Sequence, residues 1–416
     1  MIIGSNKGVI LRAADIISRE EFLEMIIEAL GIQVDLKSEH PYYMAALKQK
    51  IITKETFGEN YQKPLSKSDA AVVLVRADEY LYGKTVTDKQ IEQIINFRIS
   101  DIDKVSKARR SYIARCYQLG YLIGHSDGTY MKTRTFQPSQ KISMSTAKLL
   151  VERLLDISKR ERMSEDGQLI RTTNLPRYAN KYEYILESFP NEYYDWDFYF
   201  MGLENHEGEK AYLTENFKEF VEWCYPKNIK QYSSSTKRNY FNIDKNEIVY
   251  DKELYENCKE QWVKNVERYL QLAFNVDYRT LKTDKKWFEE MERVVIPDKT
   301  YIKKLNKYID AAIKNKTIIE CDKVAADVSG IYYYMGQYVV RCYVHYRINS
   351  ALSIERSEDF ISPILYGGHL GTAILENYKE GEWRDGYFDV EVSKFAENLG
   401  VEYCNFFDLL YVCTEE

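Results

Sequence analysis

The chain has 416 residues, of which 45% are hydrophobic, so it is long enough for two or three domains with cores of their own. It contains no run of 18 or more apolar residues, which excludes a predicted membrane-spanning helix. The net charge of -6 is unevenly divided: residues 1–163 carry 26 Lys or Arg against 20 Asp or Glu, and the remainder carries a net charge of -12. An anionic partner therefore suits the first part of the chain and not the second.

Residues 1–160 contain three copies of a helix–turn–helix pattern, spaced by roughly 50 to 75 residues. One copy could not bury its apolar face alone, so the three are expected to pack together. The copies span about 1–34, 35–97 and 98–160. The expected helices are 20–30 in the first copy, 42–52 and 69–82 in the second, and 112–119 and a helix from Ser143 in the third, with an additional short helix at 89–97.

Two sequence features recur in these copies. A Gly-x-x-x-Gly turn occurs at Gly4–Gly8 and again at Gly124–Gly128, and a polar helix entry follows it. The entries read ISREEF at 17–22, LSKSDA at 65–70 and SMST at 143–146. A serine at such a position accepts a hydrogen bond from an amide of the first helical turn.

These turns and helix entries resemble S-layer homology (SLH) repeats over about residues 1–160. The resemblance implies an all-α domain of three repeats with pseudo-three-fold symmetry. It also implies non-covalent anchoring to a pyruvylated secondary polymer of the bacterial cell wall. The third repeat departs from the family pattern, because its entry has no basic residue.

The resemblance also implies which residues bind the polymer. Arg19 matches the basic position of the family's entry motif, Lys67 is its counterpart in repeat two, and Ser18 and Ser66 match the neighbouring hydroxyl position. Arg can hold a pyruvyl carboxylate through two parallel hydrogen bonds. The alternative is that Ser18 and Glu21 form a capping box that only closes the helix end. Neither cation belongs to an apolar stripe, so we expect a double alanine variant to stay folded.

Little in the sequence points to catalysis. The five histidines show no metal-ligand spacing, so we predict no metal, no cofactor and no catalytic residue. The seven cysteines include no C-x-x-C pair, and Cys258 and Cys342 lie on predicted apolar faces as buried thiols. His345, between Arg341 and Arg347, marks either a polar sheet face that binds an acidic group or simply an exposed strand face.

The rest of the chain is predicted to form an α+β domain at 251–416 with an antiparallel sheet, after an aromatic-rich connecting region at 164–250. Helices are expected at 251–274, 287–294 and 301–314, and strands near Ile318, Tyr332, Leu365, Tyr387 and Leu410. In Tyr338–Ile348 the apolar residues alternate with polar ones, which is typical of a strand.

The preferred hypothesis is a secreted cell-surface protein, anchored to the wall polymer, whose second half is a structural or partner-binding module. A glycan-processing enzyme with its active site in 164–416 is the alternative, and a cytoplasmic helical-repeat binder is a third possibility. No nucleic acid and no membrane insertion are expected. The first repeat lacks its front helix, so we expect that a signal peptide preceded Met1 in the natural protein.

Overall fold

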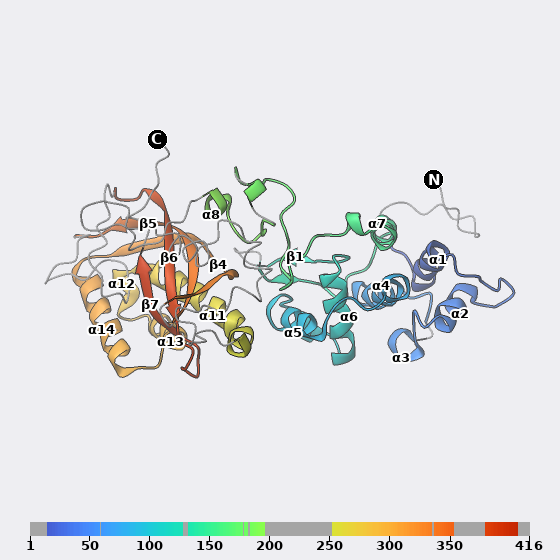
Figure 1. The fold of residues 1–416 in the computed structure, drawn as a ribbon, viewed down its shortest axis with the longest axis horizontal. Coiled ribbons are helices and arrows are strands. Elements are labelled where there is room, and N and C mark those ends of the chain that lie inside the picture. Colours follow the sequence, from blue (N-terminus) through green and yellow to red (C-terminus); the bar gives the residue numbers. More distant parts are fainter. Residues whose placement is uncertain are drawn as a thin grey trace, which may run out of the picture. The chain divides into compact units, whose positions relative to one another are not determined.

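The computed structural model describes residues 15–58, 60–127, 132–177, 179–181, 184–195, 252–334, 337–352 and 379–406. The chain divides into two compact units, one of residues 1–171 with 186–188 and the other of residues 172–185 with 189–416 (Figure 1). The first unit therefore continues past residue 160, where we expected the repeats to end. The Gly4–Gly8 turn, residues 196–250 and the expected strands near Leu365 and Leu410 lie outside the described residues.

In its described residues the first unit is helical apart from one short β pair, and each helix that we predicted there is present. The third front helix begins at Lys107 and not at Tyr112. The elements are α1 (Arg19–Ala29), α2 (Pro41–Lys48), α3 (Lys54–Phe57), α4 (Lys67–Tyr82), α5 (Asp88–Phe97), α6 (Lys107–Gln118), β1 (His125–Ser126), β2 (Arg134–Thr135) and α7 (Met144–Leu155).

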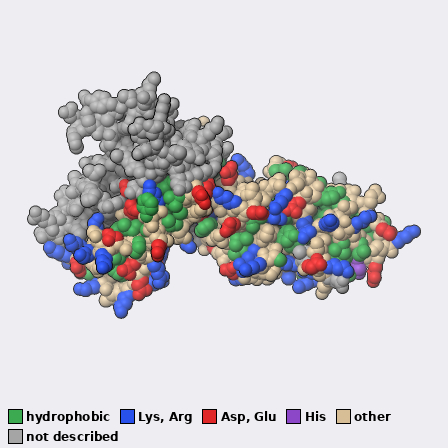
Figure 2. Space-filling view, turned by 60° about the horizontal axis from the view of Figure 1, so that its bottom comes forward, with side chains coloured by type: hydrophobic (Ala, Val, Ile, Leu, Met, Phe, Trp, Pro, Cys, Tyr) green, Lys and Arg blue, Asp and Glu red, His purple; other side chains and the backbone are tan. Residues whose placement is uncertain are grey.

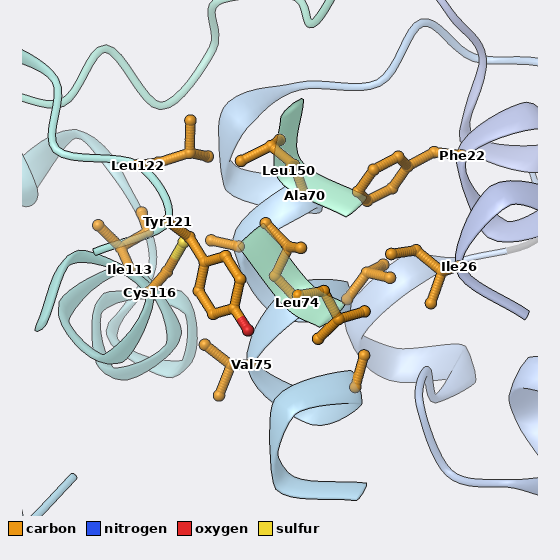
Figure 3. Close-up of a cluster of buried hydrophobic side chains, with 14 of the residues drawn as sticks. Phe22, Ile26, Ala70, Leu74, Val75, Ile113, Cys116, Tyr121, Leu122 and Leu150 are labelled. Atoms are coloured by element: carbon orange, nitrogen blue, oxygen red, sulfur yellow. The ribbon is translucent and has the colours of Figure 1, made fainter. Parts of the chain in front are cut away.

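One hydrophobic core joins these helices. Apolar side chains recur at helical spacing on α1, α4, α6 and α7, and each helix turns this stripe inward. Figure 3 shows Phe22 of α1, Leu74 of α4, Cys116 of α6 and Leu150 of α7 converging on one cluster, and all four are fully buried. The helix α4 lies in the middle, with Ala70 to Val75 entirely buried, so it forms the centre of the unit.

The three segments that precede α1, α4 and α7 are joined in a closed ring of backbone hydrogen bonds. The amide of Ile17 donates to the carbonyl of Ile142 at 3.1 Å, that of Ile142 to Leu65 at 2.9 Å, and that of Leu65 to Ile17 at 2.9 Å. Each segment thus donates to one neighbour and accepts from the other, which is the pattern of a pseudo-three-fold axis. Three equivalent helix starts surround this axis.

Two buried ion pairs explain why the unit extends beyond residue 160. Arg160 pairs with Asp78 of α4 at 2.7 Å, and Arg98 pairs with Asp166 at 2.8 Å. Asp78 also accepts a hydrogen bond from the hydroxyl of Tyr121. A buried charge that lost its partner would be strongly destabilising. The polar segment after α7 is therefore part of the unit and not a linker.

The second unit is α+β, with a five-stranded antiparallel sheet in the order β3-β4-β5-β6-β7. The helix α11 lies across β4 to β7, and no helix among the described residues is long and apolar enough to cross a membrane. The elements are α8 (Asn191–Asp195), α11 (Lys252–Ala273), β3 (Val276–Asp277), α12 (Tyr278–Leu281), α13 (Lys285–Val294), α14 (Lys299–Lys314), β4 (Ile318–Tyr334), β5 (Gln337–Ser350), β6 (Trp383–Val392) and β7 (Val401–Phe406).

The alternation predicted for Tyr338–Ile348 places one face of β5 against α11. Trp262 of α11 packs on Tyr338, and Phe274 packs edge-on against Tyr346. Our expectation of separate strands near Ile318 and Tyr332 is wrong, since both belong to the single strand β4. Its register against β5 shifts between Ala326 and Ile331. Such an irregularity lets one long strand continue where the sequence pattern is interrupted.

Candidate functional site

The first-turn amides of the helix entries are already occupied. The N1 and N2 amides of α4 donate to the carbonyls of Gln140 and Pro138, at 2.8 and 3.0 Å, and the N3 amide of Asp69 donates to the Ser66 hydroxyl. The entry of α1 is closed in the same way, because its N1 and N2 amides donate to Lys63 and Tyr61. An anion at these helix ends would therefore meet side chains and not free backbone amides.

Ser18 and Ser66 both form capping boxes. The Ser18 hydroxyl accepts the Glu21 amide at 3.2 Å, while Glu21 accepts the Ser18 amide at 2.7 Å. Ser66 and Asp69 repeat this arrangement on α4. The capping interpretation of Ser18 is thus confirmed, and the contribution of both serines to helix stability is about 1 kcal/mol each.

The Asp69 carboxylate is the centre of a buried cluster of charges. Its oxygens accept hydrogen bonds from Arg19 at 2.8 and 3.1 Å and from Arg109 of α6 at 2.7 Å. The Ser66 hydroxyl adds a fourth at 2.8 Å. The side chains of Arg19 and Asp69 are only 8% and 2% exposed. Arg19 is therefore a structural ion-pair partner as well as a cation at the helix entry.

These contacts decide the ionisation of Asp69. Burial alone would raise its pKa, but hydrogen bonds from Arg109 and Ser66 and the charges of Arg19 and Arg109 outweigh burial. The pKa of Asp69 therefore lies below its usual value, and the group is a carboxylate near neutral pH.

A pocket of about 240 Å³ opens beside this cluster. Four cationic side chains line it, while Asp69 is the one carboxylate in its wall. Its volume is below the range typical of sites for drug-sized ligands, so it suits a small group. The lining residues are Arg19, Lys63, Ser66, Ser68, Asp69, Val105, Arg109, Pro138, Ser139 and Lys141.

Lys67 does not line this pocket. Its side chain is buried and its ammonium donates to the carbonyl of Phe136 at 3.3 Å. Burial disfavours the charged form and lowers the pKa of Lys67, although the nearby Asp101 acts in the opposite direction. The expectation that Arg19 and Lys67 could both be replaced without cost to the fold considered only the apolar stripes. Because Arg19 is a buried partner of Asp69, we now expect its replacement to reduce stability.

The backbone nevertheless places Arg19 and Lys67 at equivalent positions. In a second ring of hydrogen bonds, their amides donate to Lys63 and Gln140, and the amide of Met144 donates to Asp15 at 2.8 Å. Met144 is thus the third member of the set and brings no charge. Of the two predicted cations, the structure brings only Arg19 to the pocket.

The sequence analysis missed Lys63, Arg109 and Lys141. Arg109 lies in the basic run 107–110, which precedes the helix expected at 112–119 and belongs to α6 in the structure. Lys63 and Lys141 lie within three residues of the caps Ser66 and Ser143. The one signal for these pocket residues in the sequence was that basic residues flank the entry motifs.

In the second unit, the polar face of the sheet carries a group of stacked side chains. His345 lies 2.7 Å from Asp322 and stacks on Trp383 with ring centroids 4.7 Å apart. Arg347 lies over the same indole and pairs with Glu320. These contacts are cross-strand pairs on one face of the sheet. In the described part of this unit, no hydroxyl or thiol donates a hydrogen bond to His345.

The described residues include no group of three His, Cys, Asp or Glu side chains that could hold a metal. Cys258 and Cys342 are buried free thiols, as predicted. No family model matches the chain, and a search of the curated proteins also finds no match.

Proposed function

We propose that the first unit is an SLH-type anchor that binds an acidic sugar unit of a cell-wall polymer in the pocket beside Asp69. The observation that carries this proposal is the lining of the pocket. It has one carboxylate, Asp69, and four cationic side chains: Arg19, Lys63, Arg109 and Lys141. A net positive lining favours an anionic group, and a ketal-linked pyruvate on a sugar is such a group.

The geometry around Arg109 supports a carboxylate ligand. One of its nitrogens holds Asp69, which fixes the guanidinium at the pocket wall, and its side chain is 24% exposed. A guanidinium held in this way loses little freedom on binding. Ser68 and Ser139 line the same pocket, and their side chains can bond to sugar hydroxyls, whereas the Ser66 hydroxyl is already bonded to Asp69.

On this proposal the protein is exported and held at the cell wall by its first unit. The second unit is then a structural or partner-binding module displayed at the surface.

Calorimetry with pyruvylated wall-polymer fragments tests the proposal. Replacement of Arg109 or Lys141 by Ala should each remove one charge-assisted contact, which weakens binding by about 1.5 to 3 kcal/mol, or roughly 10- to 150-fold. Lys148→Ala is the matched control, because Lys148 is an exposed lysine of α7 that does not line the pocket.

Two results would refute the proposal. Unchanged affinity in folded Arg109→Ala and Lys141→Ala variants would exclude the pocket. Equal affinity for polymer from which pyruvate has been removed would exclude the carboxylate as the recognised group.

A further inference from the structure

The helix α14 of the second unit exposes a line of lysines. Lys299, Lys303, Lys307 and Lys314 all face solvent, and Asp310 is the one acidic residue on this exposed face of the helix. The first three are spaced by four residues, so their Cα atoms rise by about 6 Å at each step. The whole line is about 22 Å long. Figure 2 shows blue side chains gathered at the left-hand edge of this unit, where Figure 1 places α14.

The overall charge of the second half conceals this basic face. Residues 278–316 carry eleven Lys or Arg and six Asp or Glu, whereas the rest of residues 164–416 carries 21 against 38. The acidic residues are therefore concentrated elsewhere. Our expectation that the second half does not suit an anionic partner rests on net charge, and net charge does not describe this helix face.

The arrangement is unfavourable for an isolated helix. Like charges four residues apart on a helix repel each other, and inside α14 no acidic residue precedes Asp310, although the N-cap residue is Asp298. Among the described residues, Lys299, Lys303 and Lys307 take part in no ion pair. An anionic partner would neutralise the line, which accounts for lysines at positions where Glu or Gln would give a more stable helix.

The chemistry of the face identifies the kind of partner. It has no Arg to hold a base or a single phosphate in a fork, and the helix's two tyrosines, Tyr301 and Tyr308, are buried, so no ring is exposed for stacking with bases. No large apolar side chain is exposed on it for insertion into a lipid surface.

We propose that the lysine face of α14 binds a linear acidic polysaccharide along its length. The ammonium groups are flexible point charges, and they suit a chain with anionic groups at regular intervals and no fixed orientation. This site is separate from the pocket beside Asp69 and does not depend on the function proposed for it.

Fluorescence anisotropy with the full chain and labelled polygalacturonate, a linear acidic polysaccharide, tests this inference. The measurement is made in the Arg109→Ala background, so that a contribution from the pocket is reduced. Changing Lys299, Lys303 and Lys307 together to Gln should weaken binding roughly tenfold or more at low salt. The logarithmic salt slope between about 50 and 200 mM should fall by about two to three, because three contacts no longer release counterions.

The matched control is a triple Gln variant of exposed lysines in the first unit, Lys37, Lys48 and Lys104, which should bind within about twofold of the parent. Circular dichroism checks folding, and single Lys303→Gln should give an intermediate loss. Equal binding by the α14 variant and its parent would overturn the inference, as would no binding of polygalacturonate at all. Tighter binding of a short DNA duplex or of phosphatidylglycerol vesicles would show that the polysaccharide is the wrong class of partner.

Discussion

Replacing Asp69 by Ala should destabilise the first unit more than any substitution at its surface. The carboxylate is 2% exposed and accepts from Arg19, Arg109 and Ser66. Its removal takes away the carboxylate that accepts two hydrogen bonds from the buried guanidinium of Arg19, and breaking a buried pair in this way costs about 3 to 5 kcal/mol. For a unit of this size, 1 kcal/mol corresponds to about 2 to 4 °C in Tm, so the melting temperature should fall by roughly 6 to 20 °C.

Asp103→Ala is the control for this change. Asp103 pairs with Arg110 at 2.9 Å but is 84% exposed, so its loss should cost at most about 1 kcal/mol. Urea unfolding followed by circular dichroism, with calorimetry for Tm, compares the two variants. If Asp69→Ala costs no more than Asp103→Ala, the cluster around Asp69 does not stabilise the fold as argued.

The same variant also tests the pocket. With Asp69 removed, Arg19 and Arg109 face each other without a carboxylate, and a small external anion such as pyruvate can take its place. Such binding stabilises the folded state by mass action. Pyruvate should therefore raise the Tm of Asp69→Ala more than that of the wild type. Equal shifts in the two proteins would mean that the anion does not bind between the arginines.

Three further predictions concern the buried charged residues of the first unit. Because the pKa of Asp69 is lowered in the folded state, its contribution to stability is complete above about pH 4 and is lost as the pH falls through the folded pKa. The difference in the free energy of unfolding between wild type and Asp69→Asn, measured with urea, should therefore shrink below about pH 4. Lys67→Met should leave polymer affinity unchanged and stability equal or higher, since Met fills the same space without a charge to bury; a tenfold weaker binding by calorimetry would contradict this. A fragment of residues 1–188 should melt cooperatively, whereas a fragment of residues 1–162, which lacks Asp166, should be less stable by several kcal/mol in thermal unfolding; equal stability would show that the added segment contributes nothing.

The sequence was sufficient for the helices and for the α+β character of the second unit. The spacing of Phe22 and Leu150 in their helices predicted which faces are buried, because that periodicity depends on the chain alone. It was also sufficient for the Ser18 cap, since Ser and Glu three residues apart interact within one turn. Local patterns therefore predicted local structure.

The ion-pair partners of the charged residues could not be predicted from local patterns. Arg19 and Asp69 are 50 residues apart, and Arg98 and Asp166 are 68 residues apart. Each pair forms only because folding of the first unit brings these distant segments together. The polar composition of the segment containing Asp166 favoured a linker, while its burial depends on a partner far away in the sequence.

The same long-range contacts make the three repeats unequal. The backbone ring places Arg19, Lys67 and Met144 at equivalent N1 positions. Arg19 pairs with Asp69, the N3 residue of α4, whereas the N3 residue of α7 is the neutral Thr146. Lys67 instead folds back onto a backbone carbonyl, and Met144 has no charge to contribute. Of the three equivalent residues only Arg19 lines the pocket beside Asp69, so the backbone symmetry does not extend to the charges in the part of the chain that the structure describes.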